Sequence, residues 1–173
     1  MLGVVMAGGK SSRFGKEKML VKFKNDYLID IACKAIIESG NKCVVAISNN
    51  APETKRYVMQ NYDYIETPGD GYCFDVSYIL KNYEKTFLTA SSDLPFLKSS
   101  HISEFLNAYK GGSMSGMLKK KNYLLYVGIN IVSDKNLFSI YIFTDYLLGI
   151  NINTPEDLKY AESLQNLAGF QIP

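Results

Sequence analysis

Leu2-Gly-Val-Val-Met6 runs directly into Ala7-Gly-Gly-Lys10, and this junction near the start of the chain indicates the architecture. A short apolar run is typical of a buried strand, and the glycines that follow it break the strand at a turn. Glycine lets backbone N–H groups approach an anion closely, because no Cβ stands in the way. The pattern predicts a strand that ends in an anion-binding loop.

The rest of the chain alternates strand patterns with helix patterns. Strands are expected at 43–47, 64–66, 86–90, 124–132 and 150–152, and helices at 26–39, 52–58, 72–83, 100–109 and 154–167. Thr154, Pro155 and Asp157 form a capping-box-like start for the last helix. This alternation predicts an α/β fold, with a mostly parallel sheet and helices on both faces. Ligands of such sheets lie outside the carboxyl ends of the strands.

The composition is that of one ordinary globular domain, spanning residues 1–173. Hydrophobic residues make up 47% and charged residues 21% of the chain, close to the average for folded proteins. No apolar run approaches the roughly 20 residues of a membrane helix, and no secretory signal is visible, so a cytoplasmic location is expected. The formal net charge of +2 does not indicate a nucleic-acid-binding protein.

Cysteine and histidine usage narrows the chemistry. Cys33, Cys43 and Cys73 are odd in number and widely spaced, which predicts reduced thiols and disfavours a disulfide scaffold or a zinc ribbon. The one histidine, His101, nearly excludes a histidine-based metal site or a Ser-His-Asp triad. His101 itself is expected at the surface, in the first turn of a helix.

The loop at residues 7–18, Ala-Gly-Gly-Lys-Ser-Ser-Arg-Phe-Gly-Lys-Glu-Lys, has the features of a phosphate site. Arg13 can grip phosphate oxygens with its guanidinium fork, and Lys18 adds a point charge. A solvated basic turn is the plainer interpretation. Two common phosphate loops do not fit: the first glycine of a P-loop falls at Val4, and Lys10 stands where the dinucleotide pattern needs glycine.

Asp93 is the second candidate, because it follows the apolar run 86–90 within Ser92-Asp-Leu-Pro95. A carboxylate at a strand end beside a phosphate loop is well placed to bind Mg²⁺. The cation would bridge the phosphates and offset the charge that builds up in phosphoryl transfer. The alternative interpretation is an aspartate that forms a turn and caps the next helix.

Further loop residues carry weaker signals. The segment 69–72, Gly-Asp-Gly-Tyr, could be a bare turn or could present its backbone to a base or sugar. Gly128 interrupts a strand pattern, which marks a bulge or a close backbone approach. Asn151 and Asn153 alternate, so they would share one side of a strand, or they are polar residues that lead into a helix cap.

The remaining charged residues suit the surface. Asp70 and Asp75 are expected as surface groups. The run Lys-Lys-Lys at 119–121 is typical of a solvated hairpin tip, although it could attract an anionic substrate.

Three motifs together resemble the signature of the nucleotidyltransferases related to molybdenum cofactor guanylyltransferase. They are the loop at 7–18, Ser-Asp-Leu-Pro-Phe at 92–96 and Asn-Ile-Asn-Thr-Pro-Glu-Asp-Leu at 151–158. A narrower resemblance is to the archaeal adenosylcobinamide-phosphate guanylyltransferase family, carried by segments 48–55, 69–72, 91–93 and 128–132 and the C-terminal Asn-Ile-Asn-Thr. It implies a Rossmann-like, glycosyltransferase-A-type fold, and transfer of GMP from GTP to adenosylcobinamide phosphate with release of pyrophosphate.

The resemblance also implies roles for individual residues. It places Arg13, Lys18 and Asp93 in catalysis, with Asp93 as the Mg²⁺ ligand. The implied nucleotide-binding residues are Ala7, Gly8, Gly9, Lys10, Ser11, Lys18, Gly69, Gly71, Tyr72, Asp93, Gly128, Asn151 and Asn153. The sequence departs from the family at Met19, where many relatives have proline, and at Phe14, where methionine is usual; Lys16 could share the role of Lys18.

The partners expected on this basis are GTP and a corrinoid phosphate, with no nucleic acid and no membrane, and a homodimer is possible. A phosphate monoester is a competent nucleophile near neutral pH, because its second pKa is about 6, so the reaction needs no dedicated general base. Three other interpretations stay open. They are a molybdenum cofactor guanylyl- or cytidylyltransferase, a sugar-phosphate nucleotidylyltransferase and a nucleotide-binding regulatory module without turnover.

Overall fold

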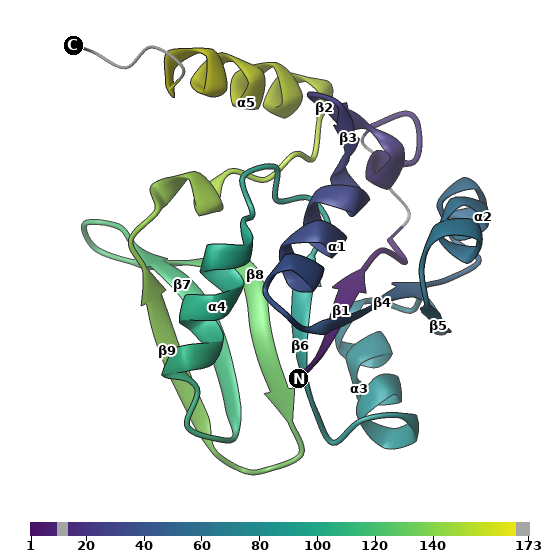
Figure 1. Cartoon of the computed structure of the whole chain (residues 1–173), viewed down its shortest axis with the longest axis vertical. Coiled ribbons are helices and arrows are strands. Elements are labelled where there is room, and N and C mark those ends of the chain that lie inside the picture. Colours follow the sequence, from purple (N-terminus) through teal and green to yellow (C-terminus); the bar gives the residue numbers. More distant parts are fainter. Residues whose placement is uncertain (10–13, 169–173) are drawn as a thin grey trace.

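One seven-stranded sheet forms the centre of the molecule, in the order β5-β4-β1-β6-β8-β7-β9 (Figure 1). The structure is a computed structural model that describes residues 1–9 and 14–168. The strands of the sheet are β1 (Leu2–Met6), β4 (Lys42–Ile47), β5 (Tyr64–Glu66), β6 (Thr86–Ser91), β7 (Ser113–Lys119), β8 (Leu124–Ser133) and β9 (Phe138–Phe143). Strands β5, β4, β1 and β6 run parallel, as do β7 and β9, whereas β8 is antiparallel to both its neighbours. The predicted mostly parallel sheet is confirmed.

Helices follow the strands in the parallel half of the sheet. The α-helices described are α1 (Leu28–Glu38), α2 (Pro52–Asn61), α3 (Tyr72–Asn82), α4 (Ser99–Ala108) and α5 (Pro155–Ala168). Two 3₁₀ turns, η1 (Lys18–Leu20) and η2 (Tyr146–Gly149), and a small hairpin of β2 (Lys22–Phe23) with β3 (Asp26–Tyr27) complete the described elements.

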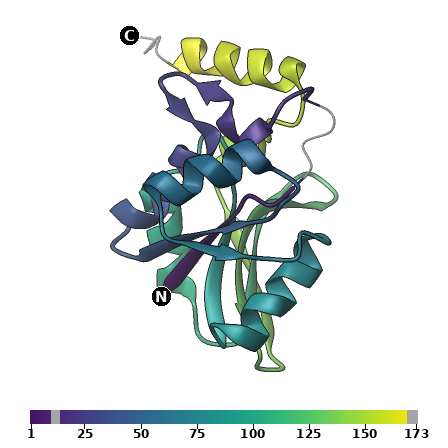
Figure 2. The same cartoon turned by 90° about the vertical axis from the view of Figure 1, so that its right-hand side faces the viewer.

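The two faces of the sheet are covered by different helices, because successive side chains of a strand point to opposite faces. Val5 of β1 belongs to a core cluster that it shares with α1, α2 and α4. Its neighbour Val4 packs in a second cluster with Val76 and Ile79 of α3. The expectation of helices on both faces is therefore confirmed, and the two views agree on it (Figures 1 and 2).

The last helix begins as the sequence predicted. Thr154 Oγ1 accepts the backbone N–H of Asp157 at 3.2 Å, and Asp157 Oδ2 accepts the backbone N–H of Thr154 at 2.9 Å. These reciprocal bonds form a capping box. Helix α5 lies over the β2–β3 hairpin (Figures 1 and 2), where Ala161 and Ile152 share a cluster with Phe23.

Two predicted elements differ from the structure, and two strands of the sheet were not predicted. Residues 150–152 form no strand. Ile152 donates its N–H to the Asp93 carbonyl at 3.0 Å, a loop contact, and not to a neighbouring strand. Asp26 and Tyr27 pair with β2 instead of starting a helix, which begins at Leu28. Strands β7 and β9 were not predicted, and the serines and the glycine of β7 explain its weak signal, since these residues do not favour strands.

Two expectations from composition can also be checked. Cys33, Cys43 and Cys73 are free thiols, as predicted. Within residues 1–9 and 14–168, each helix is too short or too polar to cross a bilayer.

Candidate active site

Three loops meet at the carboxyl ends of the parallel strands, as the sequence predicted. The loops follow β1, β5 and β6, and they enclose a pocket of about 580 Å³. The residues that line this pocket are Met6, Gly8, Gly9, Lys18, Met19, Gly69, Asp70, Gly71, Tyr72, Asp75, Ser91, Ser92 and Asp93. Ala7 is buried between β1 and this pocket and donates its N–H to the carbonyl of Ala46 at 3.0 Å.

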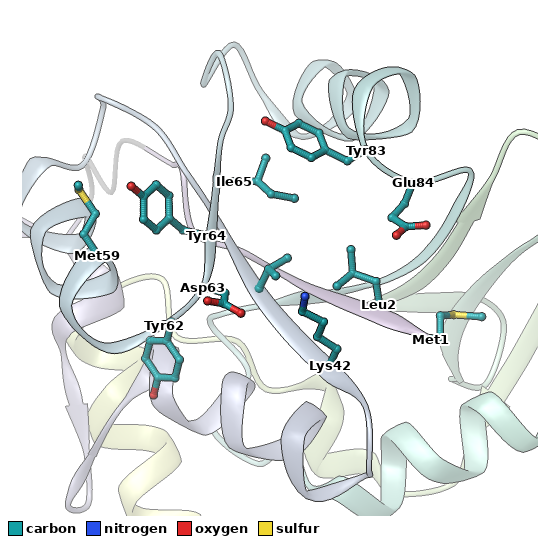
Figure 3. A pocket seen from close by; sticks show the side chains of 11 residues that line it. Met1, Leu2, Lys42, Met59, Tyr62, Asp63, Tyr64, Ile65, Tyr83 and Glu84 are labelled. Carbon is teal, nitrogen blue, oxygen red and sulfur yellow. The ribbon is translucent and has the colours of Figure 1, made fainter.

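A larger hollow of about 970 Å³ lies at the opposite ends of the same strands (Figure 3). Leu2 and Lys42, which line it, stand at the amino ends of β1 and β4. None of the described residues that line this hollow is a glycine. Because ligands of parallel sheets lie at the carboxyl ends, the smaller pocket is the candidate site.

The centre of the site is an ion pair between Lys18 and Asp93. Lys18 Nζ donates to Asp93 Oδ2 at 2.8 Å and to Asn153 Oδ1 at 2.9 Å. Asp93 Oδ1 accepts from Ser91 Oγ at 2.6 Å and from Asn151 Nδ2 at 3.0 Å. The side chains of Lys18 and Asp93 are only 12% and 13% exposed. The first loop, the end of β6 and the segment before α5 thus converge on one carboxylate.

The surroundings of Asp93 favour its charged form. Burial alone would raise the pKa of this carboxyl, but the Lys18 ammonium and the hydrogen bonds from Lys18, Ser91 and Asn151 outweigh it and hold the pKa below its usual range. Asp93 is therefore a carboxylate at neutral pH.

Glu17 fixes the start of η1 and with it the position of Lys18. Its carboxylate accepts the backbone N–H groups of Glu53 at 2.8 Å and of Thr54 at 2.5 Å, at the N-terminus of α2. The free N–H groups and the dipole of a helix N-terminus favour a negative charge. No sequence pattern marked Glu17, because its partners belong to a helix that starts 35 residues later.

Glycine is required at two positions around the pocket. Gly69 has a φ of +79°, and a Cβ there would lie 2.6 Å from Asn50 Nδ2 and 2.7 Å from Ser48 Oγ. Gly128 has a φ of +74°, and a Cβ there would lie 2.8 Å from Ser91 Cβ. The close backbone approach predicted for Gly128 is confirmed, and it lies against the serine that donates to Asp93.

The first glycine loop is open to the pocket at its second glycine. Ser48 Oγ donates to the carbonyl of Gly8 at 2.9 Å and so ties the loop to the end of β4. A Cβ on Gly9 would meet no described atom within 4 Å. On that side the backbone at Gly9 meets no atom of the described residues, and Gly9 lines the pocket, as a glycine of a phosphate-binding turn would.

Tyr72 opens α3 at the edge of the site. Its hydroxyl lies 2.9 Å from Thr89 Oγ1 and accepts from Asn130 Nδ2 at 3.2 Å. Burial raises the pKa of Tyr72, and the two hydrogen bonds partly oppose that shift. The tyrosine thus links the loop 69–72 to β6 and β8.

Two expected surface residues are buried. Asp75 is 4% exposed and accepts the N–H of Gly69 at 2.8 Å, because the loop backbone there needs an acceptor. His101 is 5% exposed and does stand in the first turn of α4, but its Nε2 lies 3.2 Å from Asp145 Oδ2, and its Nδ1 accepts the N–H of Lys98. Both surface predictions are wrong, since tertiary partners bury these side chains. Asp70, by contrast, is exposed as expected.

The remaining predicted residues belong to the first loop and to the turn between β7 and β8. Lys10, Ser11 and Arg13 lie outside the described residues. Lys16 is exposed, whereas Lys18 makes the contact with Asp93. The lysine run at 119–121 forms the turn between β7 and β8, as expected of a hairpin tip.

Comparisons with known proteins identify relatives of this chain. The family described as MobA-like NTP transferase domain matches residues 3–125. A protein of Methanocaldococcus jannaschii named adenosylcobinamide-phosphate guanylyltransferase is 33% identical over 95% of this chain and 97% of its own length. A probable molybdenum cofactor guanylyltransferase of Halalkalibacterium halodurans is 31% identical over 62% of this chain and 56% of its own length.

A solved structure shows the same fold. CMP:2-keto-3-deoxy-manno-octonic acid synthetase, complexed with CTP, superposes with a TM-score of 0.74 over 96% of this chain and 99% of that chain. Only 12% of the residues are identical, so this likeness concerns the fold alone. It confirms the Rossmann-like, glycosyltransferase-A-type architecture.

Proposed function

Because this chain belongs to the MobA-like NTP transferase family, we propose that it transfers GMP from GTP to adenosylcobinamide phosphate and releases pyrophosphate. The observation that carries the proposal is the Lys18–Asp93 pair beside the open backbone of Gly9. It lies in a chain that aligns over 95% of its length with a guanylyltransferase. Such a site offers charge neutralisation and positioning, which are the main requirements of phosphoryl transfer.

The proposed reaction is one in-line displacement. A phosphate oxygen of the acceptor attacks the α-phosphorus of GTP, a new P–O bond forms, and the bond from the α-phosphorus to the bridging oxygen breaks. The electron pair of that bond leaves with pyrophosphate. Because the second pKa of a phosphate monoester is about 6, the acceptor is already ionised at neutral pH and no residue has to remove a proton.

The described residues take distinct parts in this proposal. The backbone of Gly8 and Gly9 holds the triphosphate, and Lys18 neutralises the charge that builds up on the phosphates. Asn151 and Asn153 keep Asp93 and Lys18 in place through the hydrogen bonds given above. The loop from Gly69 to Tyr72 borders the nucleoside.

Asp93 also fits a divalent cation. Mg²⁺ is commonly held by one or two carboxylates together with substrate phosphates, and not by a cage of protein ligands. No group of three or more metal-ligating acidic, histidine or cysteine side chains occurs among the described residues, and the ionised carboxylate of Asp93 beside a phosphate site suits this arrangement. Mg²⁺ held by Asp93 would supply charge neutralisation to the nucleotide's phosphates.

A second candidate acceptor is a molybdopterin. The identity to a probable molybdenum cofactor guanylyltransferase favours it over other acceptors. The same pocket would then serve the same nucleotidyl transfer, and only the acceptor would change.

Pyrophosphate release tests the proposal. The full chain is assayed with Mg²⁺ and adenosylcobinamide phosphate, with GTP, ATP, CTP and UTP in parallel. We expect release with GTP alone and only when the corrinoid is present. Release that requires a molybdopterin would favour the second acceptor. No release, while GTP still raises the melting temperature, would overturn the enzyme proposal and leave a nucleotide-binding module.

A further inference from the structure

Asp75 is a buried carboxylate in the pocket that the proposed chemistry does not use. The side chain is 4% exposed and lines the same pocket as Asp93. Its Oδ1 accepts the N–H of Gly69 at 2.8 Å. Among residues 1–9 and 14–168, Gly69 is the one donor to this carboxylate. Oδ2 points toward the first glycine loop, because a Cβ on Gly8 would lie 3.6 Å from it.

A carboxylate in this position is expected to accept hydrogen bonds from a further donor. Burying a charged or polar group is costly unless its hydrogen-bonding capacity is used. An ionised carboxylate can accept about four hydrogen bonds, and the described protein supplies one. The remaining capacity faces a pocket lined by Gly8, Gly69 and Gly71, where glycine permits the flat face of a ligand to approach closely.

Asp93 and Asp75 lie on different sides of β1. Asp93 follows β6, whereas Asp75 is bonded to the loop after β5, beside Ser48 at the end of β4. In the sheet, β4 and β5 lie on one side of β1 and β6 lies on the other. Because the pocket has Asp93 and Lys18 on one side and Asp75 on the other, it suits a nucleotide with its phosphates at Lys18 and its base at Asp75.

We propose that Asp75 determines the specificity for guanine by accepting hydrogen bonds from its N1–H and its 2-amino group. This inference rests on the proposed function. Guanine presents two adjacent donors on this edge. Adenine presents the N1 lone pair there, cytosine presents N3 and O2 as acceptors, and uracil presents one N–H between two carbonyl oxygens. Only guanine offers two adjacent donors to the two oxygens of a carboxylate. Each of the other bases places an acceptor against the carboxylate.

The plainer role for Asp75 is to hold the loop at Gly69. Asparagine separates the two roles, since its Oδ1 still accepts the Gly69 N–H while its amide nitrogen replaces the oxygen that faces the pocket. Inosine triphosphate separates them further, because it differs from GTP only by the missing 2-amino group.

Equilibrium binding by calorimetry, with Mg²⁺ and no acceptor, tests the inference. Wild type, Asp75→Asn and the control Asp134→Asn, which removes an exposed carboxylate in the β8–β9 turn, are titrated with GTP, ITP and ATP. We expect wild type and the control to bind GTP at least tenfold more tightly than ITP. Asp75→Asn should bind GTP about 10- to 100-fold more weakly and should bind GTP and ITP almost equally.

Each outcome has one meaning. A variant that keeps the wild-type ratio of GTP to ITP affinity overturns the role of Asp75 and leaves the proposed function intact. If wild type binds GTP and ITP equally, the role of Asp75 is also overturned, and this result does not depend on whether any variant folds. Wild type that binds none of the three nucleotides overturns the proposed function together with this inference.

Discussion

At the scale of single residues, the site depends on how Asp93 is kept charged in a nearly closed position. Removing one partner of a buried ion pair leaves an uncompensated charge, which costs about 3–5 kcal/mol. The side chains of Lys18 and Asp93 are 12% and 13% exposed, so the pair is close to fully buried. The pair is therefore expected to contribute to stability as well as to catalysis.

Replacing Lys18 tests its place in catalysis. We expect Lys18→Met to lower kcat/KM by about 100-fold or more, because loss of one preorganised charge at a developing anion costs roughly that much. Lys135→Met is the matched control, since Lys135 is exposed in the β8–β9 turn. Steady-state pyrophosphate release measures both variants. A Lys18→Met enzyme with wild-type kcat/KM would remove the lysine from the mechanism.

The ionisation of Asp93 gives a pH dependence with a defined sign. Its pKa is lower in the folded protein than in the unfolded chain, where it is about 3.9. The resulting stabilisation is fully present above the unfolded pKa and is lost as the pH falls through the folded pKa. The stability advantage of wild type over Asp93→Asn should thus be constant above pH 5 and shrink below about pH 4. Urea unfolding across this range measures it, and an equal difference at pH 3 and pH 7 would contradict the account.

At the scale of elements, caps and short turns position the site. Glu17 joins the first loop to α2, and Asp145 caps η2 by accepting the N–H of Leu147 at 3.0 Å. Burial would raise the pKa of Asp145, but the Leu147 bond and the charges of Lys98 and His101 lower it. Asp145 contacts Lys98 and His101 at the start of α4. Because η2 leads directly to Asn151, this contact helps to set where the Asn151 amide meets Asp93.

The capping of α2 by Glu17 can be tested by deletion and rescue. Glu17→Ala should lower the free energy of unfolding by about 1 kcal/mol, as loss of a helix cap does. It should also lower kcat severalfold, because Lys18 loses its anchor. Glu17→Gln keeps an acceptor and should recover most of the stability. Urea titrations and kinetics measure both; a Glu17→Ala variant with wild-type kcat would limit Glu17 to a structural role.

The junction of α4 with η2 predicts a second pH effect. Burial lowers the pKa of His101, and the nearby Asp145 carboxylate only partly opposes that shift. The unfolded chain, with a histidine pKa of about 6.5, then binds a proton more readily than the folded protein, so stability falls as the pH drops below about 6.5. Because this is the one histidine of the chain, His101→Gln should flatten the melting temperature between pH 7 and 5. An unchanged slope would contradict this assignment.

At the scale of the whole molecule, the sequence predicted the parallel half of the sheet well. Strands β1, β4, β5 and β6 and helices α1 to α4 follow local periodicity, which a short window of sequence contains. The small β2–β3 hairpin was not predicted. The part of the sheet that contains the antiparallel strand β8 was harder to predict from the sequence. Strand β9 exposes Phe138, Ile140 and Ile142, so its outer face is as apolar as its inner one and shows no alternation.

The candidate site was predictable in its loops but not in its contacts. The glycine loop and Asp93 have recognisable residues at strand ends. The bonds from Asn151 to Asp93 and from Lys18 to Asn153 join residues 58 and 135 positions apart, and they depend on the packing of α5 over the β2–β3 hairpin. The burial of His101 was missed for the same reason, because its partner Asp145 lies 44 positions away. The partner of Asp75, Gly69, lies only six positions away, but the residue pattern does not show that the side chain turns back to this loop.

In the proposed reaction, the α-phosphate of GTP passes to the acceptor. The most direct test follows GTP labelled at the α-phosphorus, incubated with the full chain, Mg²⁺ and adenosylcobinamide phosphate. We predict that the label appears in the corrinoid product, one for each pyrophosphate released. Label that stays in GTP, or that appears only as free GMP, would contradict the claim.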